Sequence, residues 1–177
     1  VLSPDIAHKT EIGGVVLDIG SAHELERARR RIVEQAARLR PDARLVGVTY
    51  EVADVRSTDL ADAFRRHATD VCVHLAAIVT PGKKTDRDFE YQVDVEGTRN
   101  VLKACVGAGT GQVLISSSGA AYGYHADNPA WLSETDAIRG NHEFAYAWHK
   151  RLVEEMLAEY REREPQLRQT VFRIGTI

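Results

Sequence analysis

Tyr146 and Lys150 have the clearest capacity for chemistry in this sequence, because they are four positions apart in the segment Tyr-Ala-Trp-His-Lys. On a helix, this spacing places both side chains on one face, within reach of each other. A nearby ammonium favours the phenolate form of a tyrosine, and a phenol tuned in this way can act as a general acid–base. The pair predicts a proton-transfer site, and its alternative interpretation is an exposed helix pair.

A serine run lies about thirty residues before this pair. Ser116, Ser117 and Ser118 end an apolar stretch and are followed by Gly-Ala-Ala-Tyr-Gly. A hydroxyl at this point could bind a substrate hydroxyl or carbonyl beside Tyr146. A serine run alone indicates only a loop, but a serine run followed by a helical Tyr and Lys favours a catalytic site.

Other polar or small residues follow predicted strands, where the ligands of parallel sheets bind. The carboxylate of Asp18 could accept both hydroxyls of an adenosine ribose, and an ordinary turn aspartate is an equal alternative. Asp54 could reach an adenine amine or cap a helix. Ala76 and Ala77 are small enough for a flat cofactor to lie against the backbone.

Short apolar runs rich in β-branched residues alternate with amphipathic segments, and this pattern predicts how these residues are positioned. We expect strands over 14–19, 44–55, 70–75, 112–116 and 169–174. We expect helices over 22–39, over a segment that carries Leu60, Phe64 and His67, over 89–105, and over 143–162. This alternation is typical of a doubly wound α/β domain, a parallel sheet with helices on both faces. We assign the domain to residues 14–177 and an irregular segment to 1–13.

The composition excludes several classes of protein. The 177 residues are 44% hydrophobic and 28% charged, with a net charge of −3, which argues against a disordered chain and a strongly basic nucleic-acid binder. No apolar run approaches the ~20 residues of a membrane span. Cys72 and Cys105 are distant and form no CxxC motif, so we expect no metal site, no disulfide framework and a cytoplasmic location.

Five motifs occur in a characteristic order along most of the chain. They are AspValCysValHisLeuAlaAla at 70–77, Tyr91 with AspValGluGlyThrArgAsn at 94–100, SerSerSerGlyAlaAlaTyrGly at 116–123, the YxxxK motif at 146–150, and PheArgIle at 172–174. Together they resemble the extended short-chain dehydrogenase/reductases, the group of NAD-dependent nucleotide-sugar epimerases and dehydratases. The resemblance implies an incomplete Rossmann-like sheet and NAD as the cofactor.

The resemblance also implies roles for individual residues. Ser118 would polarise the substrate oxygen, Tyr146 would exchange its proton, and Lys150 would hold the nicotinamide ribose. The cofactor-binding residues implied by the resemblance are Asp18, Asp54, Val55, Leu75, Ala76, Ala77, Ser116, Tyr146 and Lys150.

The sequence departs from the family pattern in several places. No GxxGxxG turn follows a first strand, and no C-terminal substrate domain follows Ile177, so we expect a fragment. Asp94 stands where the family usually has Asn. Trp148 and His149 stand where a small residue and Ser are common, and His149 is interpreted as a surface histidine or a substrate contact.

The resulting hypothesis is an NAD-dependent oxidoreductase or epimerase that acts on a hydroxyl carbon of a sugar or nucleotide sugar. One alternative is a non-catalytic dinucleotide-binding sensor or degenerate homologue, and another is an NAD(P)-dependent ketone or steroid reductase. We expect a small-molecule substrate, no nucleic-acid or membrane partner, and leave a homodimer open. An isolated 177-residue chain is expected to bind NAD poorly.

Overall fold

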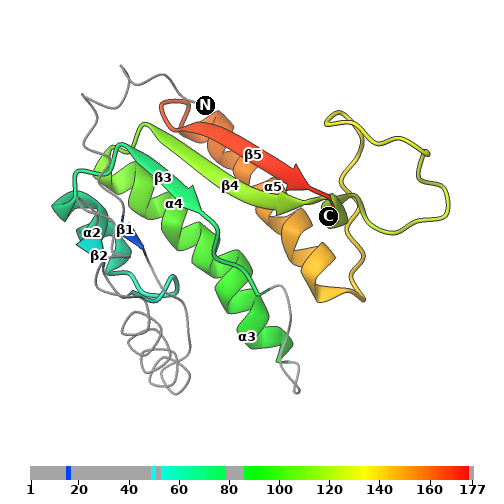
Figure 1. The fold of residues 1–177 in the computed structure, drawn as a ribbon, viewed down its shortest axis with the longest axis horizontal. Coiled ribbons are helices and arrows are strands. Elements are labelled where there is room, and N and C mark those ends of the chain that lie inside the picture. The colour runs from blue at the N-terminus through cyan, green and yellow to red at the C-terminus, as the bar shows by residue number, and fades with distance from the viewer. Residues whose placement is uncertain (1–14, 17–48, 51–52, 79–85, 176–177) are drawn as a thin grey trace, which may run out of the picture. The chain divides into compact units, whose positions relative to one another are not determined.

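A computed structural model describes residues 15–16, 49–50, 53–78 and 86–175 (Figure 1). The chain divides into two compact units, Val1–Asp54 and Val55–Ile177. In the first unit, strand β1 (Val15–Val16) pairs in parallel with β2 (Thr49–Tyr50). These two strands lie inside the segments for which the sequence predicts strands, whereas the predicted helix over 22–39 lies outside the described residues.

The second unit is built on a three-stranded parallel sheet. Strands β3 (Val71–His74), β4 (Gln112–Ser118) and β5 (Arg168–Ile174) lie side by side in that order. β4 pairs with β5 in register from Gln112 opposite Arg168 to Ser118 opposite Ile174. Because all three strands are parallel, their carboxyl ends meet at one edge of the sheet, where ligands bind in such folds.

Helices connect these strands and confirm the predicted Rossmann-like α/β class. The helical elements are α2 (Leu60–Arg66), α3 (Arg87–Tyr91), the π-helix η3 (Gln92–Glu96), α4 (Gly97–Ala108), the 3₁₀ turn η4 (Gly119–Tyr122) and α5 (Ala145–Arg163). The single helix predicted over 89–105 is therefore three consecutive helical segments. α4 ends where Gly109 adopts a φ of +73°, a left-handed conformation that glycine adopts without steric cost.

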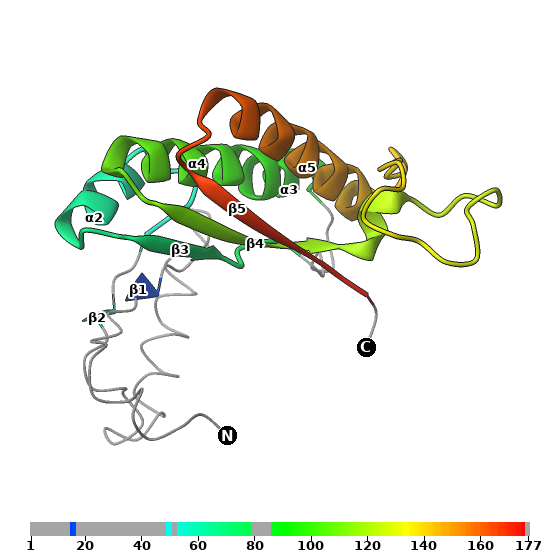
Figure 2. The same ribbon diagram turned by 90° about the horizontal axis from the view of Figure 1, so that it is seen from above.

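Alternating strand residues face the helices and form the core. Cys72 and His74 on β3, and Val113 and Ile115 on β4, are buried. Figure 2 shows α4 and α5 on the same face of the sheet. On the described part of the other face, the side chains Val71, Val73, Phe172 and Ile174 are exposed, so the described helices cover one face rather than both.

The core side chains are mostly aliphatic, and most of them come from α2, η3, α4, β4 and α5. The largest fully buried side chains are Leu60, Leu102, Leu157, Leu167, Val55, Val93, Val95, Val101, Val113 and Cys105. Cys72 and Cys105 are both buried and free.

Candidate active site

Lys150 lies at the centre of a group of polar side chains beside the carboxyl ends of β3, β4 and β5. The residue is buried, and its Nζ donates a hydrogen bond of 2.8 Å to the carbonyl oxygen of Ser116 on β4. The same nitrogen lies 5.5 Å from the centroid of the Tyr146 ring. The four-residue spacing thus places the phenol and the ammonium together on the first turns of α5, as the sequence predicts.

Two carboxylates influence the charge of this ammonium. Burial lowers the pKa of Lys150 below its usual value, because desolvation disfavours the charged form. The carboxylates of Asp94 and Glu154 act in the opposite direction and favour the protonated amine. Each carboxylate has a cationic or potentially cationic partner of its own, described next.

Asp94 connects three elements through its carboxylate and its backbone. Oδ1 accepts a hydrogen bond of 2.8 Å from the backbone N–H of Ile78, which follows β3, and Oδ2 lies 3.0 Å from Nδ1 of His149 on α5. Both side chains of this Asp94–His149 pair are 4% exposed. His149 is therefore not a surface histidine, because the first turns of α5 pack against η3 and cover it.

A second histidine lies in the same polar layer. Thr98 donates its hydroxyl proton to the carbonyl oxygen of Asp94 at 2.6 Å, and its Oγ1 lies 2.9 Å from Nε2 of His74. Because the hydroxyl proton is already used, Oγ1 acts as the acceptor for Nε2–H of a neutral His74. Burial, with Lys150 as a smaller cause, lowers the pKa of His74 to about 4, so this imidazole is uncharged at neutral pH.

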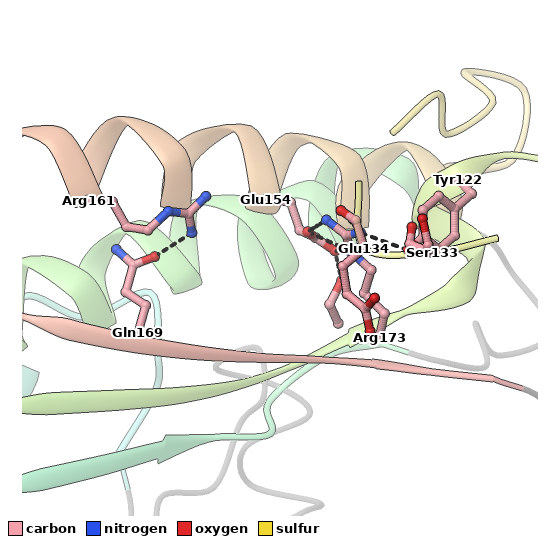
Figure 3. A network of polar contacts seen from close by, with 8 residues as sticks. Tyr122, Ser133, Glu134, Glu154, Arg161, Gln169 and Arg173 are labelled. Carbon is pink, nitrogen blue, oxygen red and sulfur yellow. Dashed lines mark hydrogen bonds and ion pairs between the residues drawn. The ribbon is translucent and has the colours of Figure 1, made fainter. Parts of the chain in front are cut away.

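Glu154 forms the other buried carboxylate site, shown in Figure 3. Arg173 on β5 donates from Nε and Nη2 to this carboxylate, with the shortest bond at 2.7 Å, and Ser117 also donates to it. Nη1 of Arg173 donates to the hydroxyl of Tyr122 at 2.7 Å, and this hydroxyl donates to the carbonyl oxygen of Ser133. The network ties α5, β4, β5 and η4 together next to the serine run.

Ser118 begins the 3₁₀ turn that follows β4. Its Oγ accepts a hydrogen bond of 3.1 Å from the N–H of Ala120, which caps η4. A hydroxyl that accepts this bond keeps its own proton available for another acceptor. η4 packs against α5, the helix that carries Tyr146, so the serine and the tyrosine come from two elements in contact.

The other predicted cofactor residues fall into different surroundings. Ala76 and Ala77 are half-buried and Leu75 is exposed, directly after β3. Asp54 is half-buried. The side chain of Val55 is buried against Gly97, and its carbonyl oxygen accepts a hydrogen bond from Asn100. Asp18 lies outside the described residues.

Sequence reasoning missed the partners that hold this group together. Glu154 lies one helical turn after Lys150, so its place on the same face could have been inferred from the spacing. The contact of Arg173 with Glu154 joins residues 19 positions apart on a strand and a helix, and no local pattern indicates it.

The described part of the chain contains neither a candidate metal site nor a helix suited to span a membrane. No cluster of His, Cys, Asp and Glu residues there has the arrangement needed to hold a metal ion. None of the described helices is long and apolar enough to cross a membrane.

Comparison with known proteins gives concordant matches. The model of the NAD dependent epimerase/dehydratase family matches residues 19–177. A UDP-glucose 4-epimerase of Erwinia amylovora is 32% identical over 115 residues, which are 64% of this chain and 33% of that protein. The chain thus spans about a third of the length of this curated relative.

Solved structures share the fold. A UDP-glucose 4-epimerase from Brucella ovis in complex with NAD matches with a TM-score of 0.63 and 26% identity, over 76% of this chain and 40% of that one. A UDP-glucose 4-epimerase from Stenotrophomonas maltophila with bound NAD matches with a TM-score of 0.67 and 23% identity, over 91% and 45% of the two chains.

Proposed function

Because the chain belongs to the NAD dependent epimerase/dehydratase family, we propose that the protein containing it is an NAD-dependent enzyme that acts on a hydroxyl-bearing carbon of a nucleotide sugar. The relative from Erwinia amylovora, a UDP-glucose 4-epimerase, supports this substrate class. Epimerisation is the reaction we favour, with simple oxidation and dehydration as related outcomes of the same first step.

The residues at the carboxyl ends of β3 and β4 fit the nicotinamide half of NAD. Ala76 and Ala77 have small side chains, and the Lys150 ammonium, fixed by the Ser116 carbonyl, can donate further hydrogen bonds to ribose hydroxyls. The pyrophosphate of such cofactors is bound by a glycine-rich turn and a helix N-terminus, neither of which lies among the described residues.

The proposed mechanism assigns one role to each of three side chains. When bound, NAD accepts a hydride from the substrate carbon and can return it. The adjacent Lys150 ammonium stabilises Tyr146 as the phenolate, and this phenolate removes the proton of the reacting hydroxyl as its general base and becomes a neutral phenol. Ser118 donates its hydroxyl proton in a hydrogen bond to the same substrate oxygen.

The observation that carries this proposal is the placement of the Lys150 ammonium 5.5 Å from the Tyr146 ring centroid, beside the Ser116 carbonyl. In the full-length protein, Tyr146→Phe should lower turnover of UDP-glucose by ~10²–10⁴-fold, the usual contribution of a general acid–base group. NAD affinity, measured by calorimetry, should change little, because the phenol acts on the substrate.

Tyr160→Phe provides the matched control on the same helix. Tyr160 is buried at the other end of α5, and its hydroxyl forms no hydrogen bond with the described residues. The control should keep the parent rate. A Tyr146→Phe variant that also keeps most of the parent rate would show that the pair is a structural contact and that the proposal is wrong.

One observation favours a second candidate, an NAD(P)-dependent ketone or steroid reductase. Phe144 and Tyr124 are exposed, and the Phe144 ring lies 6.1 Å from the Tyr146 ring and 5.9 Å from the Tyr124 ring. An aromatic surface beside the proposed base suits a substrate with an apolar ring system. Turnover of a steroid ketone, with none of UDP-glucose, would favour this candidate.

A further inference from the structure

The Asp94 carboxylate uses its two oxygens for two different partners on two different elements. Oδ1 accepts from the Ile78 backbone N–H, and Oδ2 faces Nδ1 of His149. The π-helix η3 presents the carboxylate at this point, and π-turns inside helices are frequent at functional sites. One side chain thus joins the backbone after β3 to the turn of α5 that carries Lys150.

This arrangement determines which nitrogen of the His149 imidazole carries the proton. An ionised carboxylate can only accept hydrogen bonds, so a hydrogen bond between Oδ2 and the imidazole requires a proton on Nδ1. Asp94 therefore selects the Nδ1–H form of His149, as carboxylates orient imidazoles elsewhere. The ring is also held by an edge-on contact with Tyr91, whose ring centroid lies 5.8 Å away.

An asparagine at position 94 would give a different arrangement. It has one acceptor oxygen and one donor nitrogen. If the oxygen accepts from Ile78, the amide nitrogen faces Nδ1 of His149, and a hydrogen bond then requires the proton to move to Nε2. Asp94 and His149 therefore match each other chemically, and changing the first alone disturbs the second.

The pair also affects the charge of the next residue. Asp94 is one of two carboxylates that favour the protonated form of Lys150, the other being Glu154. His74 also lies near Asp94 and Lys150, and its imidazole is neutral at pH 7. Removing the Asp94 charge leaves the buried ammonium with Glu154 alone, whose carboxylate is already shared with Arg173.

We propose that Asp94 and His149 form a matched pair of positioning residues, which fixes the Tyr146–Lys150 turn of α5 against the β3 exit. The expected effect of this pair on turnover rests on the proposed function, whereas the hydrogen bond between Asp94 and His149 does not depend on it. Because both side chains are only 4% exposed, we assign them a positioning role.

The first test is nuclear magnetic resonance of the full-length protein labelled on histidine and lysine. The His149 signal should show a proton on Nδ1 in the parent protein and on Nε2 in the Asp94→Asn variant. The pKa of Lys150 should fall in Asp94→Asn, because the opposing carboxylate is lost. In the control Glu96→Gln, both signals should stay unchanged, because Glu96 lies on the same helical stretch but pairs with Arg99 near the surface.

The second test separates positioning from simple packing by exchanging His149. An asparagine places a donor N–H close to the position of Nδ1, whereas a leucine fills similar space without a donor. His149→Asn should keep turnover within about threefold, and His149→Leu should lower it by about tenfold to a hundredfold, the size expected for a displaced catalytic group. Thermal melting of each variant checks that the protein is folded.

The outcomes distinguish this inference from the proposed function. An unprotonated Nδ1 in the parent protein, or equal activity of folded His149→Asn and His149→Leu, would overturn the pairing. A parent protein that shows the expected His149 and Lys150 signals but neither binds NAD nor turns over UDP-glucose would instead refute the proposed function and leave only the structural pairing.

Discussion

The two buried carboxylates near Lys150 have different kinds of partner. Glu154 is paired with Arg173, a guanidinium that stays charged at any pH at which the protein is folded. Asp94 is paired with His149, whose imidazole has a proton that can occupy either nitrogen. One carboxylate thus has a permanently charged partner and joins α5 to β5, whereas the other selects the tautomer of an imidazole and joins α5 to the β3 exit.

The largest effect is expected on the Glu154 side. Glu154→Ala should destabilise the protein by about 3–5 kcal/mol, because it leaves the Arg173 guanidinium, whose side chain is only 19% exposed, without its carboxylate. Urea unfolding measures this loss. The control Glu155→Ala removes an exposed ion pair with Arg151 and should cost no more than about 0.5 kcal/mol. Equal losses of stability in the two variants would show that the buried Glu154–Arg173 pair contributes no more than the exposed Arg151–Glu155 pair.

Acid should lower the stability that the neutral His74, which is linked to Asp94 through Thr98, contributes to the protein. His74 has a pKa of about 4 in the folded protein and about 6.5 when unfolded, so the unfolded chain binds more protons between these values. Stability from this residue is fully present above pH 6.5 and is lost as the pH falls toward 4, by up to about 3 kcal/mol. Urea unfolding between pH 7 and 4 should show a smaller acid loss in His74→Gln than in the parent. An identical pH dependence would mean that His74 titrates normally.

A smaller effect is expected for the hydroxyl that links His74 to Asp94. Thr98→Val removes the acceptor of the His74 Nε2–H and the donor to the Asp94 carbonyl, with no change of side-chain shape. Because Thr98 is buried, water cannot replace these bonds, and the cost should be about 2 kcal/mol. Differential melting of the two proteins tests this value, and a neutral substitution would contradict the proposed hydrogen-bond chain.

The smallest effect is expected at the corresponding hydroxyl on the Glu154 side. Tyr122→Phe removes the acceptor of one Arg173 N–H and the donor to Ser133. Arg173 keeps its bonds to Glu154, and the Ser133 carbonyl lies in an exposed residue, so the cost should be about 1 kcal/mol. If Tyr122→Phe lost more stability than Thr98→Val in the same melting assay, the predicted order of the two hydroxyl substitutions would be wrong.

The sequence predicts those parts of the site that depend on local periodicity. The YxxxK spacing places Tyr146 and Lys150 on one helical face, and the β-branched runs indicate the strands that end shortly before Ala76 and at the serine run. These features depend on helical and strand repeats, which a sequence shows directly.

The rest depends on tertiary contacts and on a local departure from the helical repeat. Uniform α-helical spacing across 89–105 gives no indication that η3 widens at Gln92–Glu96, so the direction of Asp94 and its contact with His149 were not predicted. The Glu154–Arg173 pair joins two elements whose packing no single segment determines. The role of Asp18 stays a prediction.

The wide turn of η3 also has a consequence for how the gene can change in length. A π-turn contains more residues than an α-turn, so deleting one residue between Gln92 and Glu96 can restore a regular α-helix without breaking the chain. Because the π-turn absorbs the extra residue locally, such a deletion changes the direction of the side chains inside the turn, Asp94 among them, more than the helical phase of α3 relative to α4. A codon lost in this turn would therefore be tolerated by the helix and not by the active site, whereas one lost from the exposed loop at 129–135 would alter neither the helical phase nor the Asp94 carboxylate.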